Sequence, residues 1–278
     1  MATSILGAVG NDLIVPDDEV SSISVEEISG VDAKTILGVN RPVSGIEIGV
    51  DSELPLLVRG SSISNSAIRA TAGEGEVSVI KLANSKAERV GIVYGEEGGG
   101  INLDLDGVFL KNSDLSARGP GNASVWVGGS SIVRSSDFAL SDGDNFISLE
   151  EGVALQQDVR FRLGDGIDRI ELPDCVYGSG QLGLSNVSKK DRFVIGGRLV
   201  KGRDIYIGEE VLPPYLYIQF EDGTYVYDHY GYESRDCSPA TKRAYYEVSA
   251  SEGYISEGRK LKFKVISHDA DTSERVYW

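Results

Sequence analysis

A repeat of 23 residues governs the middle of this chain. Six consecutive segments begin 23 residues apart, at Glu76, Gly99, Asn122, Asn145, Asp168 and Asp191. The third and fifth residues of each segment form pairs, namely Ser78/Ile80, Ile101/Leu103, Ser124/Trp126, Ile147/Leu149, Ile170/Leu172 and Phe193/Ile195, and the next step reaches Leu216/Ile218. Alternate residues of a strand face the same side, so each pair has strand spacing. A fixed period of this size containing short strands predicts a β-solenoid, in which each coil covers the open edge of the next.

A second series of pairs lies upstream in each repeat, at Ile92/Tyr94, Leu115/Ala117, Phe138/Leu140, Phe161/Leu163 and Leu184/Asn186. We therefore expect an all-β chain, a parallel β-solenoid with 23-residue coils, each holding two or three short strands. The alternative is a β-sandwich with evenly spaced strands. The residues predicted to face the solenoid core are Ile101, Leu103, Phe138, Leu140, Ile147, Leu149, Phe161, Leu163, Ile170, Leu172, Phe193 and Ile195.

The repeat divides the chain into three predicted parts. Residues 1–58 do not follow the period, and we expect an extended N-terminal arm there that orders on assembly. Residues 59–220 form the predicted solenoid. Residues 221–278 form a small β module that begins with a hairpin, because Glu221-Asp222-Gly223 is a turn sequence between two segments of alternating aromatic residues. That hairpin is expected to cap the last coil.

The charge balance limits the partners. The chain has 27 basic and 43 acidic residues and a net charge of −16, which repels nucleic acid and anionic membranes. We expect neither as a partner. No run of apolar residues is long enough for a membrane span, and the N-terminus does not have the pattern of a secretory signal.

Tyrosine is concentrated near the C-terminus. Tyr225, Tyr227, Tyr230 and Tyr232, with Tyr245 and Tyr246 beyond them, fit either packing between strands or an aromatic platform for a glycan or a protein partner. Cys175 and Cys237 fit either two free thiols or a disulfide, and the sequence leaves both open. His229 and His268 lack a partner histidine at zinc-ligand spacing, so we expect no metal site there.

Two turn segments, Gly164-Asp165-Gly166-Ile167-Asp168 and Asp142-Gly143-Asp144-Asn145, resemble the GDGxD turns of RTX-type β-roll proteins. That resemblance implies calcium binding between adjacent turns. In this chain the motif returns only once per coil, and one carboxylate pair supplies too few oxygens for the six to eight that calcium prefers. We therefore expect turn-forming residues and no cofactor, with a calcium-dependent secreted surface protein as an alternative.

The C-terminal segment from Tyr246 to Ser267 contains Ser256-Glu257-Gly258 followed by Leu261, Phe263 and Val265 in alternation with lysines. It resembles the opening strands of a Calx-β-like or Ig-like module, and the alternation independently predicts one amphipathic strand. A solenoid with GDGxD turns and such a module is similar in style to structural proteins of marine tailed phages, cyanophages in particular. This resemblance implies a virion component, either a capsid decoration or cement protein or part of a tail or fibre, whose partners are other virion proteins or copies of itself.

Catalytic patterns are scarce, and we expect no enzyme. Solenoids can carry lyases and glycosidases when acids and bases gather on one flank. The candidates for such a cluster are Asp104/Asp106, Glu150/Glu151 and Asp204, with Arg160 and Arg162 nearby in sequence. A glycan-binding adhesin or depolymerase that acts at a host surface, with an extracellular or cell-surface location, is therefore the second hypothesis.

Overall fold

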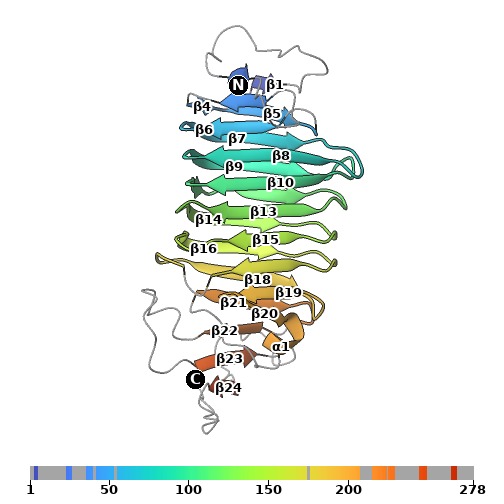
Figure 1. Ribbon diagram of the computed structural model, residues 1–278, viewed down its shortest axis with the longest axis vertical. Helices are drawn as coiled ribbons and strands as arrows, with labels where there is room; N and C mark the ends of the chain where they lie inside the picture. Colours follow the sequence, from blue (N-terminus) through green and yellow to red (C-terminus); the bar gives the residue numbers. More distant parts are fainter. Residues whose placement is uncertain are drawn as a thin grey trace, which may run out of the picture.

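The computed structural model describes residues 3–5, 23–26, 36–39, 42–52, 55–173, 176–206, 215–223, 225–228, 244–248 and 264–267. The strands run roughly perpendicular to the long axis of the molecule, and the chain proceeds from one end of that axis to the other (Figure 1). The described chain is nearly all β and forms a parallel β-solenoid of about 6 turns, about 23 residues apart. The predicted fold class is confirmed.

Two sheets form the solenoid. Sheet B has ten strands in the spatial order β2 (Ile23–Glu26), β3 (Ile36–Val39), β6 (Leu56–Arg59), β8 (Val77–Ala83), β10 (Gly100–Asp106), β13 (Ala123–Gly128), β15 (Phe146–Leu149), β17 (Arg169–Leu172), β19 (Arg192–Ile195) and β20 (Arg198–Lys201). From β3 to β19 every neighbouring pair in sheet B is parallel, so each coil contributes one strand.

Sheet A has fourteen strands. Its main path runs through β1 (Thr3–Ile5), β5 (Ile46–Val50), β7 (Ser62–Ala70), β9 (Lys86–Tyr94), β11 (Phe109–Lys111), β14 (Ile132–Ala139), β16 (Ala154–Arg162), β18 (Gln181–Val187), β21 (Leu216–Phe220), β22 (Tyr225–Asp228), β23 (Ala244–Val248) and β24 (Lys264–Ser267). Two short strands complete it: β4 (Val43–Ser44) pairs with β7, and β12 (Asp114–Ala117) pairs with β9 and β14.

Each coil bends once within sheet A. At this bend, one residue in each of five successive coils has a left-handed backbone, with φ between 46° and 62°, at Asn65, Arg89, Asn112, Ser135 and Gln157. A single left-handed residue redirects an extended chain, and Asn tolerates this conformation better than most residues. The two halves of sheet A and the flat sheet B therefore enclose the core on three sides.

The core is a continuous apolar column. Every residue of the predicted inward-facing set is buried, from 0% exposure for Ile101 to 7% for Leu140. Phe138 and Phe161 occupy the same register position in adjacent coils, and their rings stack with centroids 4.3 Å apart. Burial of each such side chain contributes about 1.5 to 3 kcal/mol, so stacking of equivalent apolar positions is the main source of stability.

One coil departs from the 23-residue phase. Val125 aligns with Leu103 on one side and with Ile147 on the other, so both steps are 22 residues long. A slip of one residue exchanges the two faces of a strand. Ala123, Val125 and Val127 therefore face the core, while Ser124 and Trp126 face outward, unlike the pairs Ile101/Leu103 and Ile147/Leu149 in the neighbouring coils. Leu216 and Ile218 do not continue the series of pairs in sheet B, because their strand β21 pairs with β18 in sheet A.

The solenoid begins before the predicted boundary at residue 58. β5, and β6 apart from its last residue, lie within the range predicted as an arm, yet β5 pairs in parallel with β7 and β6 pairs in parallel with β8. Their spacing explains the error: Ile48 aligns with Ile68 after 20 positions, and Leu56 aligns with Ile80 after 24. Unequal loops hide such coils from a search at a fixed period. Within the remainder of the predicted arm, β1 extends sheet A and the antiparallel pair β2–β3 ends sheet B.

Antiparallel strands follow the last coil. β21 and β22 form the hairpin predicted around Glu221-Asp222-Gly223, and β21 is also the parallel neighbour of β18. The hairpin therefore covers the edge of sheet A, and β23 and β24 continue the antiparallel order beyond it. In sheet B, β20 folds back on β19, and the short helix α1 (Gly202–Tyr206) follows it. Of the predicted amphipathic strand, Lys264 and Val265 lie in β24, and Leu261 and Phe263 lie outside the described residues.

Candidate functional site

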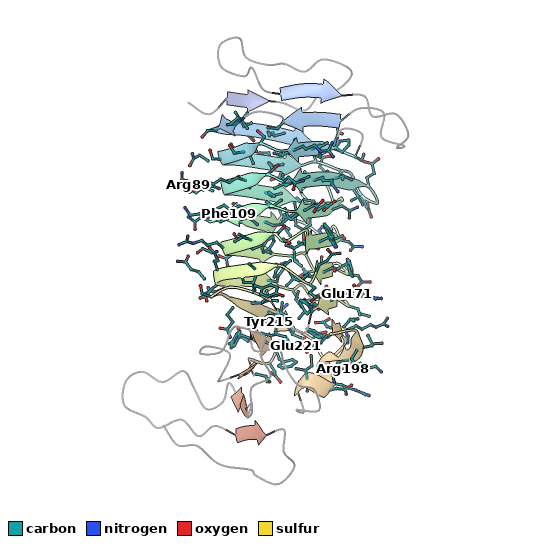
Figure 2. The ribbon with its side chains drawn as sticks, turned by 60° about the vertical axis from the view of Figure 1, so that its left-hand side comes forward. Arg89, Phe109, Glu171, Arg198, Tyr215 and Glu221 are labelled. Atoms are coloured by element: carbon teal, nitrogen blue, oxygen red, sulfur yellow. The ribbon has the colours of Figure 1, made fainter. Side chains whose placement is uncertain are left out.

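The outer face of sheet B carries a column of acidic, aromatic, polar and apolar side chains. Register places Asp104, Trp126, Ser148, Glu171 and Val194 in one column, with one residue from each of five successive coils. Phe146 lies in the adjacent column, where it aligns with Ser124 and Arg169. Figure 2 shows Glu171 and Arg198 on one flank of the rod, away from Arg89 and Phe109.

The Trp126 ring and the Glu150 carboxylate lie close together beside Gly128. A Cβ atom added to Gly128 would lie within 2.5 Å of both the Trp126 ring atom Cζ2 and the Glu150 carboxylate oxygen Oε2. The ring and the carboxylate are therefore no more than about 5 Å apart, and both occupy the space that a side chain at position 128 would fill. The indole consequently lies along the sheet surface. Its neighbour in register, Ser148, is only 9% exposed.

A groove of about 630 Å³ adjoins this pair. Carboxylates of Glu150, Glu151 and Glu171 line it, together with Tyr177, which is 50% exposed. Its apolar lining comes from Leu149, Leu172, Pro173 and Val194, and the turn at Gly196–Gly197 closes one side. The groove lies at the carboxyl ends of β15, β17 and β19, where the coils turn from sheet B toward sheet A.

The charges in this region have different partners. Arg169 holds Glu171 through two hydrogen bonds, of 2.6 Å from Nη2 and 2.9 Å from Nε. Lys81 pairs with Asp104 at 2.6 Å in the neighbouring coils. The side-chain carboxylates of Glu150 and Glu151 have no hydrogen bond or ion pair with another described residue, and both residues are exposed. These two carboxylates are therefore free to accept hydrogen bonds from a ligand.

The predicted acidic cluster is only partly assembled. Asp104 and Asp106 lie on β10, and Glu150 and Glu151 follow β15, so these four share the sheet B side. Asp204 lies in α1, where its carboxylate accepts a 3.2 Å bond from Arg203. Arg160 and Arg162 lie on β16 of sheet A, and both are exposed there. The arginines are therefore not beside the acids of sheet B, which corrects the grouping expected from their proximity in sequence.

The opposite flank of the rod carries a network of ion pairs. Lys111 and Lys86 contact Glu88 at 2.8 and 2.9 Å, and hydrogen bonds from Lys111 and then Lys86 lower the pKa of that carboxyl. The Lys86 ammonium lies 5.9 Å from the centroid of the Phe109 ring. The Lys111–Glu88 ion pair and the Lys86–Phe109 contact link neighbouring coils of sheet A.

The GDGxD turns hold a buried polar ladder. Asn145, Asp168 and Asp191 occupy the same corner of three successive coils, and each accepts a backbone N–H bond from the coil before it: Ala123 N to Asn145 Oδ1 at 2.9 Å, Asn145 N to Asp168 Oδ1 at 2.8 Å, and Asp168 N to Asp191 Oδ1 at 3.0 Å. The side chains thus hold the corners together. The exposed Asp144 takes part as well, because its carboxylate accepts the Ile167 N–H.

Burial raises the pKa values of both aspartates in this ladder. Desolvation raises the pKa of Asp168 to about 7, opposed by the hydrogen bonds from Asn145, and the nearby Asp191 adds to the rise. Desolvation also raises the pKa of Asp191. Asp168 Oδ2 is buried without a hydrogen-bond partner. Among the residues described, no group of three or more His, Cys, Asp and Glu side chains is arranged to hold a metal ion.

Several predicted residues fall outside the description. Tyr230, Tyr232, Cys175, Cys237, His229 and His268 are not among the described residues. The backbones of Tyr225 and Tyr227 lie in β22, but their side chains are also outside the description, so the tyrosine platform stays a prediction. No helix in the described ranges is long and apolar enough to cross a membrane.

Sequence reasoning missed the outward position of Trp126. The alternation of Ala123, Val125 and Val127 with Ser124 and Trp126 was the available signal, because the small apolar series predicts the opposite facing. The fixed 23-residue phase favoured the other facing.

Comparison of the chain with protein-family models, with curated proteins and with solved structures finds no match in any of the three.

Proposed function

We propose that this chain is a non-enzymatic structural protein of a virion, either a capsid decoration or cement protein or a component of a tail or fibre. The observation that supports it most is the uninterrupted stack of coils, with one apolar core from β5 to β21. A stack of this kind is stiff, because each coil is bonded along its length to the coils on either side. The marine-phage resemblance adds the kind of assembly in which the rod would serve.

Contacts between coils support a mechanical role. Beyond the backbone ladders, Ser131 Oγ accepts the Val108 N–H at 2.9 Å, and Ser113 Oγ accepts the Val90 N–H at 3.1 Å, each joining consecutive coils inside the rod. On the outer surface of the rod, Glu96 forms ion pairs with Arg69 and Arg118, which come from the coils on either side. Such repeated linkage resists the opening of a single coil.

The terminal strands supply surfaces for neighbours. β20 is the last strand of sheet B, and it carries Leu199, which is 69% exposed. An edge strand with an exposed apolar residue can pair with a strand of another subunit. We expect the partners there to be other virion proteins or further copies of this chain.

The test is to quantify the chain in virus particles purified from its source on a density gradient. The proposal predicts that the chain sediments with intact particles at a fixed copy number relative to the major capsid protein, and that it stays bound after a high-salt wash. A chain that remains in the soluble fraction while intact particles lack it would contradict the proposal.

The absolute mass in solution then separates the two positions. A stable trimer measured by light scattering favours a tail fibre or spike, in which three rods pack together. A monomer favours a decoration or cement protein, which meets its neighbours only on the lattice.

A further inference from the structure

We infer that the outer face of sheet B carries a binding site for an uncharged glycan, centred on Trp126, Glu150 and the groove that reaches Tyr177. This site goes beyond the structural role proposed above, and it differs from the tyrosine platform expected near the C-terminus. It is formed by residues of four successive coils, so the ligand would lie along the rod axis.

The first support is the arrangement of Trp126. An aromatic ring that lies along an outer sheet face offers a flat apolar surface, which suits the C–H face of a sugar ring. Gly128 is what permits this position, because any side chain there would collide with the ring and with Glu150. The indole N–H has no hydrogen-bond partner among the described residues, so a donor remains beside the ring.

The second support is the mixture of groups in the groove. Glu150 and Glu151 offer acceptors without partners, and Tyr177 adds a hydroxyl that can donate and accept. Leu172, Pro173 and Val194 provide apolar contact in the same groove. A sugar presents hydroxyl donors around an apolar ring face, so it matches both parts at once. Binding sites for small ligands commonly combine an apolar lining with a few placed polar groups.

The charge of the site selects among glycans. Three carboxylates line the groove, and only Glu171 has a described cationic partner, Arg169. A uronate or a sulfated sugar would be repelled from Glu150 and Glu151. A lysine-rich peptide would satisfy the carboxylates but would leave the apolar lining and the indole face largely unused. We therefore assign the site to neutral hexose chains.

Fluorescence titration tests the site directly. The chain has two tryptophans, Trp126 and Trp278, so a Trp278→Phe background leaves Trp126 as the only indole reporter. The probes are neutral α- and β-linked glucan and galactan oligosaccharides at millimolar concentration, oligogalacturonate as the anionic comparator, and pentalysine as the cationic one. We expect a saturable change in Trp126 emission with at least one neutral oligosaccharide and none with oligogalacturonate.

Variants locate the binding. In the same background, Glu150→Gln and Tyr177→Ala should each weaken the neutral ligand by about tenfold, which is the loss expected for one good hydrogen bond. Phe109→Ala on sheet A is the matched control, and it should bind as the parent does. Because Glu150 and Tyr177 are both exposed, melting temperatures should stay close to that of the parent.

Three results would overturn the inference: no emission change with any neutral oligosaccharide, unchanged affinity in both groove variants, or a response to pentalysine alone. The last would reassign the groove to a basic peptide segment. Isothermal titration calorimetry with Trp126→Ala completes the set, because loss of heat in that variant separates stacking on the ring from a distant effect on its emission.

Discussion

Asp168 shows how one residue in a repeat can acquire its own chemistry. In the preceding coil Asn145 fills the equivalent place, and its Nδ2 donates to the carbonyl oxygens of Ser141 and Gly143. By register the corresponding carbonyls for Asp168 are those of Gly164 and Gly166, so Oδ2 takes the place of an amide nitrogen. An ionised carboxylate cannot donate there. A proton on Oδ2 can donate there, and burial of the carboxyl, which raises the pKa of Asp168, favours this protonated form.

Asp168→Asn should therefore stabilise the protein at alkaline pH. The pKa of Asp168 rises from an unfolded value of about 3.9 to about 7 in the fold, so its favourable contribution is complete below pH 4 and is lost as pH rises through 7. The parent should lose melting temperature between pH 5 and pH 9, and the variant should gain about 1 to 3 kcal/mol at the upper end.

Charged groups around Asp168 set the background of that experiment. Asp191 and Asp144 raise the pKa of Asp168, and the phenol of Tyr94 senses the Asp168 charge. Because the pKa of Asp191 is raised as well, some pH dependence should remain in Asp168→Asn. Asp165→Asn, on the exposed part of the same turn, is the control, and an equal gain in that variant would show that net charge alone is responsible.

Ile170 tests the core at the same corner. Its side chain is fully buried in β17, between Ile147 and Phe193 of the adjacent coils. Ile170→Asp places an unpaired carboxylate in that column and should cost more than about 3 kcal/mol, which is seen as a large drop in the denaturant midpoint. Arg169→Asp on the outer face should cost far less, and a folded Ile170→Asp protein of equal stability would contradict the assigned facing.

At the scale of strands, alternation predicted most of the architecture. The pairs at 101/103, 147/149 and 170/172 have the expected facing because local alternation and the 23-residue phase agree there. They disagree at β13, and the structure follows alternation, since facing is set by burial and a turn can lose a residue at little cost. The strands β5 and β6 escaped prediction because the neighbouring coils differ in loop length.

The candidate site was predictable only in part. Glu150 was expected on a flank, but its meeting with Trp126 depends on the facing of β13 and on which strands are neighbours. The left-handed bends of sheet A and the buried serines beside them have no periodic apolar signal. Their contribution lies in backbone hydrogen bonds, which hydrophobic periodicity does not report.

The internal serines yield a prediction for this scale. Ser113 Oγ accepts the Val90 N–H at 3.1 Å and lies 3.0 Å from the Lys111 carbonyl, to which it donates. Ser113→Ala should leave that buried N–H unpaired and cost about 1 to 3 kcal/mol in urea unfolding. Ser116→Ala, in the adjoining strand β12 and less buried than Ser113, should change stability by less than about 0.5 kcal/mol. Equal effects of the two substitutions would show that the ladder bond contributes nothing.

For the whole molecule, stacking joins these features into one body. Equivalent apolar residues form the column, corner side chains form hydrogen bonds from coil to coil, and antiparallel strands end both sheets beyond the last coil. In such a linear array each coil is stabilised mainly by its two neighbours, so the middle should be more stable than the ends. A chain that bears load in an assembly needs this continuity.

Hydrogen exchange followed by mass spectrometry measures that continuity directly. Peptides covering β8 to β18 should share one slow exchange rate in both sheets, limited by opening of the whole stack, and protection should fall toward β1 and β24. Rapid exchange confined to a central coil, such as the one containing β13 and β14, would show that coils open independently and would contradict the account of a single rigid rod.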